Sequence, residues 1–204
     1  GIVVALFVRY TLREPIRGLV EDRQDVAADT PFSEVLKLLW SRLSFRHLAI
    51  GGALNAFAGY SSSNWTASFM IRSHDMSTGE LGTWLALIMG VGGAIGVFWG
   101  SYIAERLAKF DVRWYMWSPM ITGMICVPFM IATYVVEGAY TALIVSIVPG
   151  ILLNVYLGNS LAMTHALVGL RMRAVASAIL FFLINLIGMG LGPRGLGLLS
   201  DMLS

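Results

Sequence analysis

Residues 81–113 read LGTWLALIMGVGGAIGVFWGSYIAERLAKFDVR, an apolar run that ends in a short turn with three basic side chains. The apolar part exceeds the roughly 20 residues that a helix needs to cross the hydrocarbon core of a bilayer. Runs of similar character give five candidate spans, at 47–71, 81–103, 114–134, 140–165 and 174–199. The sequence therefore predicts an all-α protein with several membrane-spanning helices.

The composition and the distribution of charge support this prediction and orient the helices. Of the 204 residues, 57% are hydrophobic and 13% are charged, whereas soluble domains carry about 25% charged residues. Twelve of the fourteen basic residues fall in the segments 9–46, 104–113 and 166–173: Arg9, Arg13, Arg17, Arg23, Lys37, Arg42, Arg46, Arg106, Lys109, Arg113, Arg171 and Arg173. By the positive-inside rule these segments are expected in the cytoplasm. Lipid headgroups account for basic residues at membrane edges, so no nucleic-acid partner is expected.

The segments before the first span predict a cytoplasmic region. Residues 1–8 are apolar but too few to span a membrane, and no basic region precedes them, so they are interpreted as the end of a longer helix and not as a signal peptide. The last residues, 200–204, follow directly on a span. Both ends are therefore expected to be cuts through a larger protein, with residues 47–204 forming a transmembrane bundle.

Within the cytoplasmic region 9–46, Thr30 and Pro31 predict a helix start. Apolar residues then recur at helical spacing, namely Phe32, Val35, Leu36, Leu39, Trp40 and Leu43. This pattern predicts an amphipathic helix over 31–45 that lies in the membrane interface. The alternative is a connector that packs on the cytoplasmic ends of the spanning helices.

The first, fourth and fifth spans carry polar side chains at mid-membrane depth, where such groups usually face a cavity or a neighbouring helix. We expect a substrate cavity lined by Asn55, Tyr60, Ser62, Asn64, Trp65, Asn154, Asn159 and Asn185. His165 is the titratable residue beside a polar stripe and is the candidate proton sensor. The alternative for His165 is a headgroup-level residue at a helix end.

The second span has glycines at four-residue spacing, Gly92, Gly96 and Gly100. Such spacing permits close packing of helix backbones. The same glycines would also let helices slide during gating, which is the functional interpretation. The two prolines of the third span, Pro119 and Pro128, predict a kink there.

The sequence contains no constellation typical of an enzyme. His47, His74 and His165 fall at different membrane edges, so no metal site or cofactor is expected. No carboxylate lies deep within a span, and a proton-relaying acid would then belong to a part of the protein outside this chain. A lipid-modifying membrane enzyme and a channel are both disfavoured, because neither a nucleophile with its base nor a filter segment is present.

The turn Gly100-Ser-Tyr-Ile-Ala-Glu-Arg-Leu-Ala-Lys-Phe-Asp-Val-Arg113 resembles the G-x-x-x-D-R-x-x-R/K signature of major facilitator transporters, with Glu105 where Asp is usual. The resemblance implies a cytoplasmic gating role for Gly100, Glu105 and Arg106. Three further segments are similar to Spinster-like members, namely 12–18 (LREPIRG), 64–84 and 173–201.

The resemblance covers essentially the whole chain and implies the end of helix 6, the central loop and helices 7 to 11. The partner would be the missing N-terminal half of the same protein, and helix 12 is expected to be missing as well. The resemblance further implies a secondary active transporter, which moves small lipid-like amphiphiles of the lysophospholipid or sphingoid type with protons, by alternating access. The short loops favour a bacterial inner membrane. The alternatives are efflux of drugs or small organic ions, and a eukaryotic endomembrane location.

Overall fold

The computed structural model describes residues 2–11 and 31–203, in two units, 1–30 and 31–204. The first unit contributes helix α1 (Ile2–Thr11). The segment 12–18 that resembles Spinster-like proteins and the basic residues Arg13, Arg17 and Arg23 lie outside the described residues.

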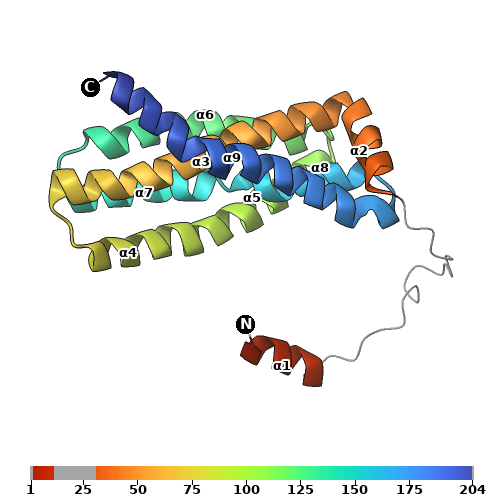
Figure 1. Ribbon diagram of the computed structural model, residues 1–204, viewed down its shortest axis with the longest axis horizontal. Helices are drawn as coiled ribbons and strands as arrows, with labels where there is room; N and C mark the ends of the chain where they lie inside the picture. Colours follow the sequence, from red (N-terminus) through yellow and green to blue (C-terminus); the bar gives the residue numbers. More distant parts are fainter. Residues whose placement is uncertain (1, 12–30, 204) are drawn as a thin grey trace. The chain divides into compact units, whose positions relative to one another are not determined.

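The second unit is helical throughout its described part (Figure 1). Its elements are α2 (Phe32–Ser41), α3 (Leu43–His74), α4 (Thr78–Leu87), the π-helix η1 (Ile88–Gly92), α5 (Gly93–Ala108), α6 (Trp114–Val135), α7 (Ala139–Leu152), α8 (Val155–Ala166), the 3-10 helix η2 (Leu170–Met172) and α9 (Arg173–Leu203). The all-α prediction is thus confirmed for the described residues, which contain no strand.

Four stretches are long and apolar enough to cross a membrane: Thr78–Ala108, Trp114–Val135, Ala139–Ala166 and Leu170–Met202. They coincide with the last four predicted spans. Helix α3 corresponds to the first, and its 32 residues extend about 48 Å at the usual rise per residue. Helix α3 is not among the four stretches, because the polar run in its middle, residues 60–66, lowers its mean hydropathy.

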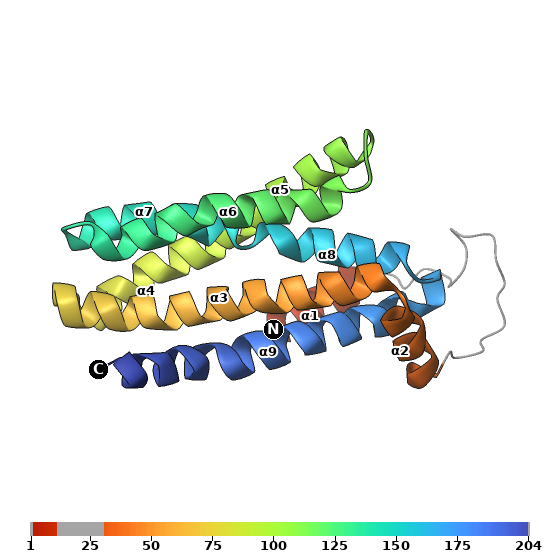
Figure 2. The same ribbon diagram turned by 90° about the horizontal axis from the view of Figure 1, so that it is seen from above.

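Successive long segments run in alternating directions, so their connections fall at two ends (Figure 2). One end holds α2, the start of α3, the α5–α6 turn and the α8–α9 connection, and we call it the α2 end. The predicted cytoplasmic segments contain further basic residues after α2 in the chain. Those that the structure describes all belong to this end: Arg42, Arg46, Arg106, Lys109, Arg113, Arg171 and Arg173. The opposite end has its own apolar cluster around Met70, Leu81 and Leu143.

The predicted amphipathic helix 31–45 is wrong in extent. The helix ends at Ser41, and Arg42 is extended, with φ −86° and ψ 115°, before α3 begins at Leu43. Sequence periodicity did not reveal the bend, because Leu43 continues the apolar spacing of α2 although it belongs to the next helix.

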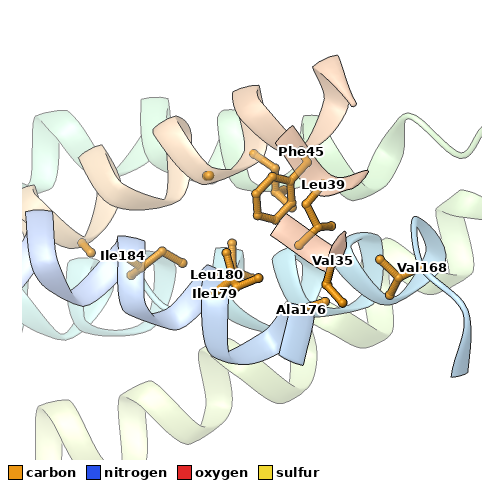
Figure 3. Close-up of a cluster of buried hydrophobic side chains, with 11 residues drawn as sticks. Val35, Leu39, Phe45, Val168, Ala176, Ile179, Leu180 and Ile184 are labelled. Atoms are coloured by element: carbon orange, nitrogen blue, oxygen red, sulfur yellow. The ribbon is translucent and has the colours of Figure 1, made fainter. Parts of the chain in front are cut away.

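Val35 and Leu39 of α2 are fully buried, in a cluster with Phe45 of α3 and Leu180 of α9 (Figure 3). Trp40 is exposed beside them. These contacts favour the connector interpretation of α2, since its apolar face packs on other helices. The helix therefore fixes the spacing of α3 and α9 at the α2 end.

Candidate functional site

A cavity of about 410 Å³ lies among α3, η1, α7, α8 and α9. Its polar side chains include Asn55, Tyr60, Asn154 and Asn185, and its apolar lining includes Phe181. We call it the amide pocket. Four of the predicted cavity residues thus converge from three separate segments of the chain on one site.

Tyr60 and Asn185 connect the two long helices that form one wall of the amide pocket. The Tyr60 hydroxyl donates to Asn185 Oδ1 at 3.2 Å, and Asn185 Nδ2 donates to the Phe181 carbonyl at 2.8 Å. The amide of Asn185 is therefore held in one orientation by partners on α3 and on its own helix α9. This arrangement presents a fixed pair of polar groups to the pocket.

Asn154 lies where the fourth predicted span is interrupted, between α7 and α8. Its Nδ2 donates to the Gly150 carbonyl at 2.8 Å, while its Oδ1 has no hydrogen-bond partner among the described residues. The interruption follows Pro149, whose ring nitrogen cannot donate within a helix. A helix break beside a cavity leaves polar backbone groups available there, as in the discontinuous helices of transporters.

Ser62 and Trp65 line a different cavity, about 570 Å³ in volume, among α3, α6 and α9. Its other walls include Phe57, Phe69 and Met130. The residues of α3 separate in this way because successive positions of an α-helix point about 100° apart. The expected single cavity is therefore two cavities that share the helix α3, and we call this second one the apolar chamber.

The remaining two predicted cavity residues have other surroundings. Asn64 is exposed and donates to the Tyr60 carbonyl at 2.8 Å, within its own helix. Asn159 is fully buried, and its Nδ2 donates to Ser118 Oγ of α6 at 2.7 Å. The prediction that Asn159 faces the cavity is wrong on this geometry, because its amide lies between α8 and α6.

His165 lies near the α2 end of α8. Its Nε2 is 2.7 Å from Ser177 Oγ of α9, and Ser177 Oγ donates to the Arg173 carbonyl at 2.8 Å. Because the serine hydrogen is used in that second bond, the imidazole Nε2–H is the donor to the serine oxygen. His165 therefore connects α8 to α9 and does not line the amide pocket.

Glycines bring α5 into close contact with α7 and α8. A Cβ added at Gly100 would lie 2.6 Å from Val155 Cγ1, and one at Gly158 would overlap Ser101 Oγ. A Cβ at Gly96 would likewise overlap the Ile151 carbonyl oxygen. The glycine spacing seen in the sequence therefore serves close helix packing.

The signature G-x-x-x-D-R places its glycine four positions before the acidic residue. Glu105 follows Gly100 by five positions, so Ser101, and not Gly100, occupies the place of the signature's glycine. Glu105 and Arg106 are exposed, and the Arg106 guanidinium lies 5.6 Å from the centre of the Tyr102 ring. The described contact of Arg106 is thus a cation–π contact within α5.

Several lining residues could not be recognised from the sequence. Met130 and Tyr134 of α6 line the apolar chamber, although the predicted cavity residues include none from the third span. Tyr134 Oη shares a hydrogen bond with Thr66 Oγ1 of α3 at 2.7 Å. The near-uniform apolarity of α6 hides this face, because no periodic polar residue marks it.

Comparison with known proteins gives a consistent result. The family model described as Major Facilitator Superfamily matches residues 1–193. An MFS-type efflux pump of Mycolicibacterium smegmatis (strain ATCC 700084 / mc(2)155) is 32% identical over 161 residues, which cover 79% of this chain and 37% of the pump.

A solved structure gives the same fold. The crystal structure of a bacterial homolog to the human lysosomal transporter Spinster, inward-facing and unoccupied, superimposes with a TM-score of 0.74 at 29% identity. The match covers 99% of this chain and 42% of that one. The chain therefore spans about two fifths of the length of each relative.

Proposed function

Because this integral multi-pass membrane chain belongs to the Major Facilitator Superfamily, we propose that it is the C-terminal part of a Spinster-like secondary active transporter for lipid-like amphiphiles. The substrate class would be lysophospholipids or sphingoid phosphates, and transport would proceed by alternating access. In this superfamily, two halves move against each other around a site near the midplane of the membrane. The missing N-terminal half would then supply the other wall of the site.

The observation that carries the proposal is the composition of the amide pocket. Tyr60, Asn154 and Asn185 give it hydroxyl and amide groups, while Met89 and Phe181 give it apolar surface. Polar groups at this depth are costly unless they face a cavity or partner. A mixed lining of this kind suits a molecule that has both a polar and an apolar part.

Among the described residues, no lysine or arginine lines the amide pocket. An anionic or zwitterionic headgroup would thus need a cation from the proposed N-terminal half. Protons are the proposed coupling ion, and His165, which connects α8 to α9 through Ser177, is the proposed sensor in this chain.

The test is uptake of a fluorescent lysophospholipid by proteoliposomes that contain the complete transporter, with and without an imposed pH gradient. We expect the gradient to accelerate uptake. Uptake that is indifferent to the gradient would contradict proton coupling, and no uptake would contradict the lipid substrate. His165→Gln retains an N–H donor for Ser177 but cannot titrate, so we expect it to retain uptake and to lose the acceleration.

The second candidate function is efflux of drugs or small organic ions, which the 32% identity to an efflux pump favours. The aromatic and amide groups of the pocket also suit such molecules. A competition experiment distinguishes the two functions. A fluorescent organic cation and a lysophospholipid are offered to the same proteoliposomes, and the uptake of each is measured. The substrate whose uptake saturates and is blocked by Asn185→Ala identifies the function.

We also propose a bacterial inner-membrane location with residues 9–46 in the cytoplasm. The concentration of basic residues at the α2 end supports this orientation.

A further inference from the structure

The amide pocket offers a ligand polar groups that carry no charge. Among the residues that the structure describes, its lining contains no acidic, basic or histidine side chain. Its polar side chains are amides and hydroxyls, namely Asn55, Asn154, Asn185, Ser63, Tyr60 and Tyr156. An ionised group that entered the pocket would therefore find no counter-ion among these side chains.

Several of these groups are free to bind a ligand. Asn154 Oδ1, the Asn55 amide and the Tyr156 hydroxyl line the pocket and have no hydrogen-bond partner among the described residues. Asn185 Nδ2 donates one hydrogen to the Phe181 carbonyl, and its other hydrogen remains for a ligand. The free set thus contains donors and acceptors side by side in one pocket.

Two of these amides are held in place before a ligand binds. Asn185 Oδ1 accepts the hydrogen bond from Tyr60 at 3.2 Å. Asn154 Nδ2 donates to the Gly150 carbonyl at 2.8 Å, which leaves the Oδ1 of the same amide as the free acceptor. A Cβ added at Gly93 of α5 would lie 3.5 Å from Asn154 Nδ2, so the Asn154 amide packs against the backbone of α5. A ligand therefore meets groups that need little reordering.

A hydroxyl matches this free set, because one hydroxyl both donates and accepts hydrogen bonds. A phosphate or carboxylate only accepts, so it would bring no hydrogen to Asn154 Oδ1, and an ammonium only donates. Without a counter-ion, either charge would also be costly in the pocket. The chemistry of the lining thus favours a neutral hydroxyl over the charged part of a lipid headgroup.

We propose that the amide pocket binds the free hydroxyl on the backbone of a single-chain lipid, and that Asn154 Oδ1 accepts its hydrogen. The inference rests on the proposed transport of lipid-like amphiphiles and names the chemical group by which the substrate is recognised. A lysophospholipid carries such a hydroxyl on its glycerol, and a sphingoid phosphate carries one next to its chain. The two proposed substrate types therefore share the group that the pocket fits.

Recognition of this hydroxyl would distinguish the substrate from the lipids that surround the protein. A diacyl phospholipid has the same headgroup, but an ester replaces the hydroxyl and has no hydrogen to donate. Such a lipid would leave Asn154 Oδ1 without a partner. A site that is built to bind a hydroxyl discriminates strongly against molecules that lack it, because its own polar groups then stay unpaired.

The first experiment compares three lipids in proteoliposomes that contain the complete wild-type transporter, with protein-free liposomes as the background. All three have the same acyl chain and a phosphocholine headgroup, which contains no hydroxyl. They differ on the glycerol, which carries the free hydroxyl, a hydrogen in its place, or a methoxy group that accepts but cannot donate. We expect kcat/KM for uptake to be about tenfold lower for both analogues, the loss expected for one hydrogen bond and an unpaired acceptor.

The second experiment assigns this discrimination to the pocket. Asn154→Ala removes the proposed acceptor, so we expect it to lower uptake of the hydroxyl lipid and to leave uptake of the deoxy analogue unchanged. Asn64→Ala is the matched control, because Asn64 is exposed, bonds within its own helix and does not line the pocket. It should keep the full ratio between the two lipids.

The outcomes separate the recognition of the hydroxyl from the proposed function. If the wild-type protein takes up none of the three lipids, the proposed function fails. If it takes up all three with equal kcat/KM, transport of amphiphiles stands and recognition of the hydroxyl is overturned. A ratio that Asn154→Ala leaves intact would place the recognition outside the amide pocket and overturn the assignment.

The source of the hydroxyl is tested with one further lipid. A deoxy analogue with a phosphoglycerol headgroup carries its hydroxyls in the headgroup alone. We expect its uptake to be as low as that of the phosphocholine deoxy analogue. Full recovery of uptake would show that the pocket binds a headgroup hydroxyl, which would overturn the assignment to the lipid backbone.

Discussion

The Tyr60 hydroxyl donates to Asn185 Oδ1 at 3.2 Å across 125 positions of the sequence. The bond joins α3 to α9 at the wall of the amide pocket, where both side chains are accessible. Since α2 also packs between these two helices at one end, the pocket wall is held both by apolar packing and by a polar pair. A substrate headgroup that enters here meets donors and acceptors with defined positions, which limits the reorganisation that binding requires.

Asn154→Ala is expected to reduce transport without loss of fold. The change removes an amide that lines the pocket and whose Oδ1 has no partner among the described residues. A lost hydrogen bond to substrate corresponds to about 0.5–1.5 kcal/mol, or roughly a two- to tenfold rise in KM. Initial rates of uptake over a range of substrate concentrations provide the measurement.

Asn64→Ala is the control for that experiment. Asn64 is exposed and bonds within its own helix, so its removal should leave KM unchanged. Equal effects of the two substitutions would contradict the assignment of the pocket to the face of Asn154.

Asn159→Leu is expected to lower stability and to leave substrate affinity unaltered. The substitution removes the hydrogen bond to Ser118 and leaves that buried hydroxyl without its partner. The cost is about 1–3 kcal/mol, visible as a lower melting temperature in detergent. A rise in KM at unchanged stability would instead place Asn159 in the substrate path.

Gly158→Ala is expected to destabilise the contact between α5 and α8. The added methyl group would overlap Ser101 Oγ, and overpacking of this kind costs about 1–3 kcal/mol. Gly123→Ala on α6 is the matched control, because nothing lies within 4 Å of the position of its Cβ. Thermal unfolding of both variants in the same detergent compares them, and equal melting temperatures would contradict the close packing.

The orientation of the bundle can be tested with cysteine labelling. Cys126 is buried, at 1% exposure, and is replaced by serine to give a background without reactive thiols. Single cysteines then replace Lys109 in the α5–α6 turn and Glu137 in the α6–α7 turn, both of which are exposed. In intact cells, a membrane-impermeant maleimide should label position 137 and not position 109, and the reverse pattern would invert the proposed topology.

The spans could be predicted because each contains an apolar run that is long enough to cross the hydrocarbon core of a bilayer as a helix. The boundary at Arg42 and the break before Val155 could not, since both interrupt a helix without interrupting its apolar character. The sequence showed which positions of the spans are polar, but it did not show toward which neighbouring helix each polar side chain points. Asn154 and Asn159 are five residues apart, which on a helix turns the second side chain about 140° from the first.

The same limit explains why two cavities were expected to be one. Ser62 and Trp65 are within five positions of Tyr60, yet they point to the other side of α3. Which side of a helix faces which neighbour is decided by tertiary packing. Here the neighbour on the second side is α6, whose sequence shows no polar periodicity.

The π-helix Ile88–Gly92 has a consequence for how this protein tolerates change in length. A π-turn contains one residue more than the α-helical turn that it replaces and still completes one turn of the helix. Deleting a single residue between Ile88 and Gly92 would therefore restore regular α-helix and leave Gly96 facing Ile151 of α7 and Gly100 facing Val155 of α8. Elsewhere in the span, each deleted residue would rotate the following part of the helix by about 100°. A one-residue deletion in the π-helix would thus disturb the bundle less than the same deletion in α5.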